Sequence, residues 1–298
     1  MSRVCPVCGN SDESKVFAPA NFNLDQLDAF AFASRKIPEH MYFRLVVCPQ
    51  CDLLYANPTL PTEKILSAYE TASFASQEEA ALAAHTYGRL LDGFLDRLPP
   101  GRDGALDIGT GDGAFLTELM KRRFLNVHGI EPSRAPIHVA KDEVRPLIRQ
   151  GIFNPDDFQK DSLSLVSCFQ TFEHAGNPLE IAQGAFKILK KGGIFFVISH
   201  NRRSLAVKMM GKSSPIFDIE HLQLFSPRSV RFLFKKAGFK KVIVKRFLNT
   251  YPLHYWLKLS PVPWKNKMMA LLDKSIFRRV PISLYVGNMA VIGVKDDE

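Results

Sequence analysis

The chain has 298 residues, 46% of them hydrophobic and 23% charged. This is ordinary globular composition, which excludes a disordered or collagen-like chain, and the length allows two domains or one extended α/β domain. No apolar run reaches the roughly 18 residues of a membrane span, and the residues from Met1 to Cys5 lack the apolar core of a secretory signal. We therefore expect a cytoplasmic protein whose five cysteines are metal ligands or core residues rather than disulfides.

The formal net charge of +9 is distributed unevenly along the chain. Residues 1–185 carry 17 Lys and Arg against 24 Asp and Glu, a balance of −7, whereas residues 186–298 carry 22 against 6, a balance of +16. A nucleic-acid binder concentrates positive charge on one face, but so does a protein that binds a membrane surface or a phosphorylated substrate. The charge alone leaves these three classes of partner open.

Two short cysteine motifs predict a metal site near the N-terminus. Cys5-Pro-Val-Cys8 and Cys48-Pro-Gln-Cys51 are both CPxC turns. Each turn directs two thiolates to one point, and two turns complete the tetrahedral sulfur site of a structural Zn²⁺ ion. The alternative is a pair of redox-active or chance turns. The segment 17–44 between the turns is expected to loop out, and Cys168, in an apolar run, is expected to be a core thiol.

A predominantly helical stretch is predicted to follow the cysteine motifs. Pro61-Thr62-Glu63 is typical of a helix start, an Ala- and Glu-rich stretch runs from Ser76 to Leu98, and Pro99-Pro100-Gly101 then interrupts the chain. We therefore predict three parts: a zinc-binding domain over 1–56, a helical connector over 57–100, and an α/β domain over 101–298.

The strongest chemical motif is the glycine-rich segment Asp107-Ile-Gly109-Thr110-Gly111-Asp112-Gly113. It follows a short apolar strand and precedes an amphipathic helix expected from Gly113 to Phe124. Its glycines let the backbone turn tightly and approach a ligand, and the N-terminus of the helix offers N–H groups to an anion. A second strand, Asn126–Glu131, ends in an acid that can bind both ribose hydroxyls of an adenosine. The alternative is a glycine turn in an unrelated doubly wound domain.

The rest of the chain alternates strands and helices in the order of an open α/β sheet. Strands are expected over Leu147–Gly151, Ser162–Phe169, Gly193–Ser199, Lys241–Phe247 and Asn288–Val294, and helices over Pro178–Lys190 and Pro227–Ala237. The last two strands are expected to pair antiparallel. The predicted fold class is α/β, a Rossmann-like seven-stranded sheet with a small N-terminal zinc-binding domain and a helical connector.

Several of these motifs resemble those of class I S-adenosylmethionine (SAM) methyltransferases. The GxGxG spacing differs from the GxGxxG of dinucleotide sites, and with Asp107 before it and Glu131 after it, it resembles methyltransferase motifs I and II. Phe172-Glu173-His174 resembles the ubiquinone-biosynthesis-type branch. The segments 45–55 and 61–69 resemble the zinc-knuckle region of sugar C-methyltransferases of glycan and natural-product biosynthesis. The resemblance implies that SAM binds to Asp107, Gly109, Thr110, Gly111, Asp112, Gly113, Glu131, Pro132, Phe153 and Gln170.

Candidate bases for methyl transfer follow the strands, because open α/β sheets bind ligands at the C-terminal strand ends. Three histidines qualify: His174, His200 and His221. We favour His221 with Glu220, since the sugar C-methyltransferases resemble this segment with a Tyr-x-Glu-His arrangement whose His is the proposed base. A carboxylate beside an imidazole can orient it and raise its basicity. The alternative is that Glu220 and His221 only anchor the loop before the next helix.

Residues 249–287 are predicted to be an aromatic and basic insertion between the last two strands. A helix from Trp264 to Ile276 would be amphipathic, and such a segment can rest on an anionic membrane or receive a lipid-linked substrate. We favour the alternative that its apolar face forms a lid over the acceptor pocket. Arg202, Arg203, Lys208 and Lys212 are expected near the acceptor, where they would bind phosphate or form a solvated surface.

The sequence therefore predicts a SAM-dependent methyltransferase for a small-molecule acceptor, such as a sugar nucleotide, a glycan precursor or a lipid-linked intermediate. A zinc-ribbon RNA methyltransferase is the alternative, but no Asn/Asp-Pro-Pro-Tyr tetrapeptide is present, and Gln170-Thr-Phe stands where a Pro-Cys pair would carry a catalytic cysteine. A non-catalytic binding module is disfavoured by the intact Asp107, glycines and Glu131. The expected location is cytoplasmic, with peripheral membrane contact through 249–287 left open.

Overall fold

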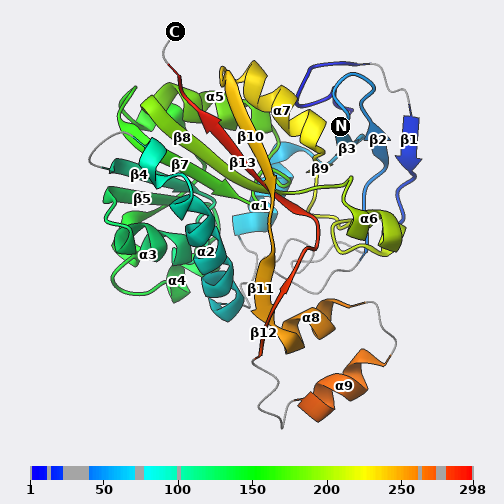
Figure 1. Cartoon of the computed structure of the whole chain (residues 1–298). Helices are drawn as coiled ribbons and strands as arrows, with labels where there is room; N and C mark the ends of the chain where they lie inside the picture. Colours follow the sequence, from blue (N-terminus) through cyan, green and yellow to red (C-terminus); the bar gives the residue numbers. More distant parts are fainter. Residues whose placement is uncertain are drawn as a thin grey trace.

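The computed structural model describes residues 2–11, 15–22, 40–70, 77–98, 102–260, 264–272 and 280–296. A seven-stranded sheet with the order β10-β13-β8-β7-β4-β5-β6 forms the centre (Figure 1). The strands are β4 (Asp103–Ile108), β5 (Leu125–Glu131), β6 (Ile148–Gln150), β7 (Leu163–Phe169), β8 (Leu189–His200), β10 (Lys241–Arg246) and β13 (Asn288–Val294). The predicted α/β class and seven-stranded sheet are confirmed.

The directions of the strands show at which end of the sheet a ligand would bind. Strands β4 to β8 run parallel, whereas β13 is antiparallel to β8 and to β10. The chain moves outward from β4 to β6 and then returns to place β7 on the other side of β4. This reversal of strand order opens a crevice at the carboxyl ends of β4 and β7, where open α/β sheets bind ligands.

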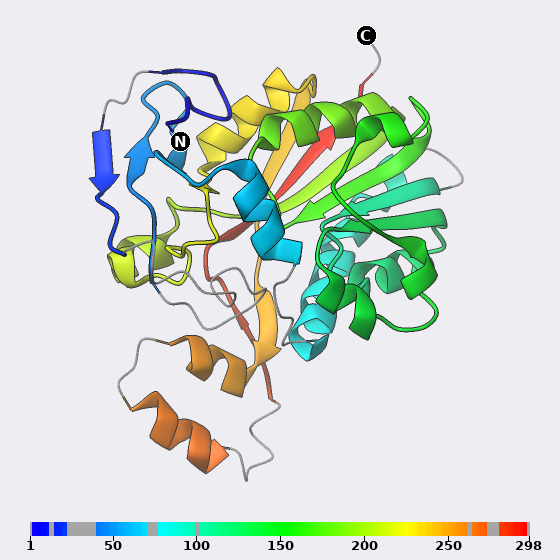
Figure 2. The same ribbon diagram turned by 180° about the vertical axis from the view of Figure 1, so that it is seen from behind.

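Helices cover both faces of the sheet because the strands are apolar on both sides. Leu106 and Val197 point to the face covered by α5 (Pro178–Ile188) and α7 (Pro227–Lys236). Ala105 and Phe196 point to the opposite face, covered by α2 (Gln77–Asp92) and α3 (Ala114–Lys121). The short α4 (Arg134–Val139) follows β5. Alternate residues of one strand therefore enter two separate cores. The helices that cover the two faces are seen in Figures 1 and 2.

The N-terminal cysteine motifs belong to a second, four-stranded sheet with the order β1-β2-β3-β9. Strands β1 (Lys15–Ala18), β2 (Leu45–Val47) and β3 (Leu54–Ala56) come from the N-terminal part, but β9 (Gln223–Leu224) comes from the second half of the chain. Strand β9 pairs antiparallel with β3. The unit lies beside α6 (Leu205–Met210) and α7 (Figure 2). The two parts of the chain therefore share one sheet.

The remaining elements differ from expectation in detail. The predicted connector contains α1 (Thr62–Glu70), α2 and a short 3-10 turn, Leu95–Arg97. Helix α5 ends at Ile188, two residues earlier than predicted, because β8 already begins at Leu189. Most of the predicted loop over 17–44 lies outside the described residues, although its start belongs to β1.

The predicted insertion begins and ends as a hairpin. Strands β11 (Asn249–Pro252) and β12 (Pro281–Leu284) pair antiparallel and extend away from β10 and β13 towards α8 (Leu253–Leu259) and α9 (Lys265–Leu272) (Figure 1). Trp256 Nε1 donates a hydrogen bond of 2.8 Å to the carbonyl of Ile282, which ties α8 to the hairpin. The end of the predicted amphipathic helix, 273–276, lies outside the described residues. Within the described chain, the helices are too short or too polar to span a membrane.

An ion-pair cluster joins the N-terminal unit to the large sheet. Asp52 Oδ1 accepts hydrogen bonds from Arg202 and, at 2.6 Å, from Arg203. Burial alone would raise the pKa of Asp52, but hydrogen bonds from Arg203 and Ser226 and the two guanidinium charges hold it below its usual value. This contribution to stability is present above the ordinary carboxyl pKa and is lost as the pH falls. Because Asp52 binds both guanidinium groups, the buried Arg202 is not available to an acceptor phosphate, whereas Arg203 remains 53% exposed and its phosphate role stays a prediction.

We predict that Asp52→Ala lowers the free energy of unfolding by about 3 kcal/mol, because the Arg202 side chain, only 5% exposed, loses its countercharge. Chemical denaturation measures the change. Asp156→Ala is the matched control, because Asp156 pairs with Lys187 at the surface, where both side chains are about half exposed or more and a pair contributes less than about 1 kcal/mol. Equal effects of the two substitutions would contradict a role for the cluster in holding the two sheets together.

Candidate active site

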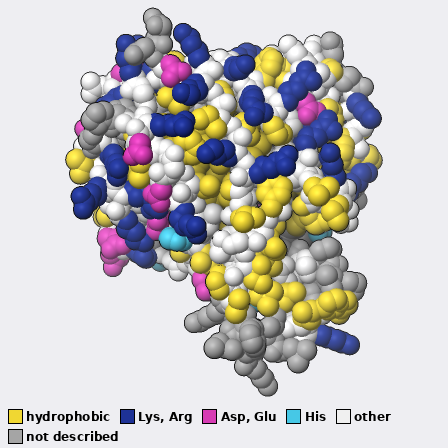
Figure 3. Space-filling model, viewed as in Figure 1, with side chains coloured by type: hydrophobic (Ala, Val, Ile, Leu, Met, Phe, Trp, Pro, Cys, Tyr) yellow, Lys and Arg dark blue, Asp and Glu magenta, His cyan; other side chains and the backbone are white. Residues whose placement is uncertain are grey.

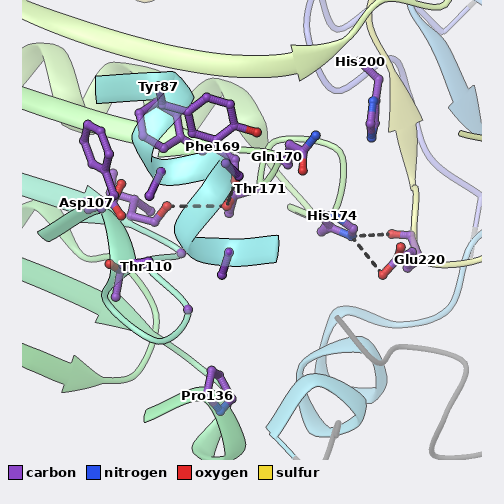
Figure 4. Close-up of a pocket in the computed structure, with 18 of the residues that line it drawn as sticks. Tyr87, Asp107, Thr110, Pro136, Phe169, Gln170, Thr171, His174, His200 and Glu220 are labelled. Carbon is purple, nitrogen blue, oxygen red and sulfur yellow. Dashed lines mark hydrogen bonds and ion pairs between the residues drawn. The ribbon is translucent and has the colours of Figure 1, made fainter. Parts of the chain in front are cut away.

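A cavity of about 570 Å³ lies at the carboxyl ends of the parallel strands. Residues directly after or at the ends of β4, β5, β7 and β8 line it, including Gly109, Glu131, Gln170 and His200. In Figure 4, Asp107, Thr110 and Pro136 lie on one side of this space, and His174, His200 and Glu220 lie on the other. The cavity therefore has two halves with different chemistry.

The glycine loop forms the first half of the cavity. Gly109 has a φ of +72°, and a Cβ atom there would lie 2.3 Å from Thr171 Oγ1, so a larger residue is excluded. Gly111 has a φ of +61°, but a Cβ atom at this position would meet no atom within 4 Å. The backbone at Gly111 is thus exposed to the cavity, where a ligand can approach it closely.

Two buried carboxyl groups flank this loop. Glu131 Oε2 accepts a hydrogen bond from the Gly111 N–H at 2.9 Å, and its Oε1 accepts one from the Ser133 N–H at 2.9 Å. Burial nevertheless raises the pKa of Glu131. Asp107 Oδ1 accepts a hydrogen bond of 2.6 Å from Ser167 Oγ, and burial raises the pKa of Asp107 to about 6. Glu131 keeps acceptor capacity for the two hydroxyls of a ribose.

The structure brings the predicted cofactor residues together. Except for Gly113, all of them line the cavity: Asp107, Gly109, Thr110, Gly111, Asp112, Glu131, Pro132, Phe153 and Gln170. Gly113 instead forms the left-handed N-cap of α3, with a φ of +74°. Its contribution is to start the helix below the loop.

Three histidine rings form the second half of the cavity. The ring centroid of His221 lies 4.9 Å from that of His174 and 5.1 Å from that of His200. His174 follows β7, His200 ends β8 and His221 precedes β9, so three separate segments converge. Glu220 also lines the cavity, and its carboxylate oxygens lie 3.9 Å from His174 Nδ1 and 4.0 Å from His221 Nε2. We refer to these four residues as the histidine cluster.

Hydrogen bonds orient the rings of the histidine cluster. His221 Nδ1 lies 2.8 Å from the carbonyl oxygen of Ile216, and His200 Nδ1 lies 2.8 Å from Asn288 Oδ1. Both oxygens are acceptors, so each Nδ1 carries the proton and each Nε2 carries the lone pair in the neutral ring. Burial lowers the pKa of His174, which favours its neutral form. The cluster therefore offers neutral imidazole nitrogens whose lone pairs can accept a proton.

Sequence reasoning missed Tyr69, which α1 contributes from the predicted connector. Its hydroxyl lies 2.8 Å from His174 Nδ1 and 3.3 Å from the carbonyl oxygen of Glu220. The sequence contained no signal for this contact, because 105 residues separate the partners. The hairpin and α8 add Tyr251, Tyr255 and Trp256 to the lining, whereas none of the described residues of the predicted lid helix, 264–272, lines the cavity. The aromatic character of these three lining residues was the signal that singled out this segment.

The charge of the cavity differs from that of the second half of the chain. Among the described residues that line it, none is Lys or Arg. Lys208 and Lys212 are exposed, and they flank the lining residues Met210 and Ser214. Positive charge therefore stands beside the cavity rather than inside it.

The four N-terminal cysteines converge as predicted. The Sγ atoms of Cys5 and Cys51 are 3.5 Å apart, and those of Cys8 and Cys48 are 3.4 Å apart. All four sulfur atoms lie within 4.8 Å of one another. Four Zn–S bonds of about 2.3 Å in a tetrahedron separate the sulfurs by about 3.8 Å, so this set fits a closed zinc site. Cys168 is fully buried in the core, as expected.

Comparisons with known proteins agree with this geometry. Residues 80–244 match a family model described as "Methyltransferase domain". The ubiquinone biosynthesis O-methyltransferase of Acinetobacter baylyi is 28% identical over 167 residues, which cover 51% of this chain and 70% of the relative. The protein of that name from Pseudomonas fluorescens is 30% identical over 184 residues, which cover 56% of this chain and 77% of the relative. Another such relative, from Actinobacillus pleuropneumoniae, is matched over only 45% of its length.

A solved structure shows the same fold at low sequence identity. The YcgJ protein of Bacillus subtilis superposes with a TM-score of 0.51 and 14% identity, and the match covers 72% of this chain and 99% of that protein. At this identity the likeness extends to the arrangement of helices and strands alone.

The raised pKa of Asp107 predicts a pH dependence of stability. Its folded-state pKa of about 6 exceeds the ordinary 3.8, so its stabilising contribution is complete below about pH 4 and is lost as the pH rises through 6. We expect the unfolding free energy of the wild type, relative to Asp107→Asn, to fall by about 3 kcal/mol between pH 4 and 7. Denaturation of ligand-free protein across this range measures the difference. A difference that does not change with pH would show that Asp107 ionises normally.

Proposed function

Because the chain belongs to the methyltransferase-domain family, we propose that this SAM-dependent methyltransferase transfers its methyl group to a hydroxyl of a small acceptor bound beside the histidine cluster. The observation that carries the proposal is that one cavity contains both the glycine loop with Glu131 and the histidine cluster. Methyl transfer needs the methyl group and the acceptor atom held in line, so a shared cavity is the first requirement.

The residues of the first half suit the parts of SAM. Glu131 would bind the ribose hydroxyls, and the open backbone at Gly111 would lie against the cofactor. Bound SAM supplies an electrophilic methyl group on its sulfonium. Asp107, hydrogen-bonded to Ser167, would hold the start of the glycine loop in place.

Proton removal falls to the histidine cluster. His221 Nε2 carries the lone pair, because Nδ1 is held by the carbonyl oxygen of Ile216. As the new O–C bond forms, the acceptor O–H bond breaks and its proton passes to Nε2, while the electron pair of the S–C bond stays on sulfur. The Glu220 carboxylate, 4.0 Å away, would stabilise the resulting imidazolium. His174 and Tyr69 would fix the wall against which the acceptor lies.

The part of the acceptor that lies inside this cavity is expected to be uncharged. A phosphate inside would face a described lining without Lys or Arg and lose hydration without compensation. A sugar nucleotide, a glycan precursor or a lipid-linked intermediate fits only if its hydroxylated part enters and its phosphate stays outside near Lys208 and Lys212. Oxygen as the methylated atom is supported by the relatives named O-methyltransferases.

Two further assignments complete the proposal. The four N-terminal cysteines would hold a structural Zn²⁺ ion, because their geometry leaves no open coordination position. Nucleic acid is a less suitable acceptor, because the described residues that line the cavity include no Lys or Arg to bind its phosphates. Hydrophobic side chains lie low on the face seen in Figure 3, towards α8 and α9, and the peripheral membrane contact would occur there.

We predict that Glu131→Gln weakens SAM binding at least about tenfold, because the neutral amide keeps the size of the side chain but loses the charge-assisted hydrogen bonds to the ribose. Calorimetric titration with SAM measures the affinity. Glu143→Gln, at an exposed position, is the matched control and should bind normally. Unchanged affinity of Glu131→Gln would remove this carboxylate from the cofactor site, and no SAM binding by the wild type would refute the proposed function.

For His221→Ala we predict a fall in turnover of about 100-fold with unchanged SAM affinity, since a general base contributes this much and His221 lies in the acceptor half. Candidate hydroxylated acceptors are assayed with SAM, and calorimetry confirms cofactor binding. His128→Ala, on an exposed face of β5, is the control. Full activity of His221→Ala would assign the base to another residue of the cluster.

A further inference from the structure

Three side chains of the histidine cluster have the composition and spacing of a metal site. His174, Glu220 and His221 each offer one ligand atom, and these atoms lie within 4.8 Å of one another. Two imidazoles and one carboxylate form the ligand set of several catalytic metal centres, which keep one or more positions open for substrate. We propose that these three residues bind a divalent transition-metal ion in the acceptor half of the cavity.

The surroundings of the cluster support this assignment. A metal-bound histidine usually donates its second ring N–H to a carbonyl or carboxylate oxygen, which fixes the ring. His221 has this arrangement, because its Nδ1 lies 2.8 Å from the carbonyl oxygen of Ile216 and its Nε2 is the atom that faces Glu220. In His174, the Tyr69 hydroxyl and the Glu220 carbonyl oxygen both lie against Nδ1, so this ring would bind the ion through Nε2.

The charge of the three proposed ligands also suits a bound cation. Histidine binds a metal as a neutral imidazole. The Glu220 carboxylate therefore supplies the only formal charge in the described ligand set. Among the described residues that line the cavity, none is Lys or Arg. The ligand atoms lie within 4.8 Å of one another, and a contraction to the roughly 3 Å found around one ion would complete the site.

This site is chemically distinct from the cysteine site. Four thiolates surround a structural ion and close it off, whereas nitrogen and oxygen ligands suit Zn²⁺, Fe²⁺ or Co²⁺ and leave room for an added oxygen ligand. The cysteine set lies in the N-terminal unit, whereas the histidine set follows β7 and precedes β9.

The role of the ion rests on the proposed function. His221 Nε2 is the proton acceptor of the metal-free protein; with the ion bound it is a ligand instead, and His200 takes over proton removal. The acceptor hydroxyl would bind the open position, where the ion makes it more acidic. Its O–H proton would pass to His200 Nε2, whose Nδ1 is held by Asn288 Oδ1, as the O–CH₃ bond forms and the S–CH₃ electron pair returns to sulfur.

Titration of the full-length protein with Co²⁺ tests the site directly. Cobalt bound to thiolates shows intense sulfur-to-metal charge-transfer absorption, whereas cobalt bound to nitrogen and oxygen shows only weaker visible bands. We expect the wild type to develop both signals. His221→Ala and Glu220→Gln should retain the thiolate signal and bind cobalt at the second site at least about 100-fold more weakly, and Tyr69→Phe about tenfold more weakly. The exposed His128→Ala is the control and should match the wild type.

Absence of a nitrogen-and-oxygen cobalt signal in the wild type would overturn the proposal, as would a signal that persists unchanged in both His221→Ala and Glu220→Gln. Thermal melting of each variant establishes that it is folded. Calorimetry with SAM on the same samples separates this proposal from the function. SAM binding without the second cobalt signal refutes the metal site alone. A cobalt signal that depends on His221 in a protein that binds no SAM refutes the function alone.

Discussion

The acceptor half of the cavity depends on the pairing of β9 with β3. Strand β9 begins two residues after His221, and its two residues continue the sheet of the N-terminal unit. Gln223 in β9 is fully buried, and its side-chain amide donates hydrogen bonds to the carbonyl oxygens of Phe172 and Ala175, which bracket His174. The guanidinium of Arg3 donates to Gln223 Oε1. One small sheet therefore holds the loops of His174 and His221 at a fixed separation.

The uneven distribution of charge along the chain is explained in part by contacts within the molecule. Basic residues of the second half bind the N-terminal unit: Arg202 and Arg203 bind Asp52, Arg228 donates to the carbonyl oxygen of Gln50, and Lys236 donates to that of Cys8. Part of the positive balance thus serves attachment of the cysteine turns rather than capture of an anionic partner. Charge-assisted hydrogen bonds to carbonyl groups are strong enough for this role.

Local sequence predicts the cofactor half well and the acceptor half only in part. The loop from Asp107 to Gly113 is one continuous segment, and Glu131 follows at the end of the neighbouring strand, so its geometry is encoded by spacing. The cysteine turns are local in the same way. Tyr69 and the Asp52–Arg202 pair involve partners 105 and 150 residues apart, which only tertiary packing brings together. The phosphate role expected for Arg202 failed for this reason.

The shared four-stranded sheet also bears on how the chain can be divided. A cut at residue 100 would follow the break suggested by three residues, Pro99-Pro100-Gly101. The C-terminal fragment would keep the glycine loop, but β9 would become an exposed edge and Tyr69 would be lost from the cavity. Unpaired edges invite association between molecules. The cut would also remove α2, which covers one face of the large sheet and lines the cavity, so both halves of the cavity depend on the part of the chain before residue 100.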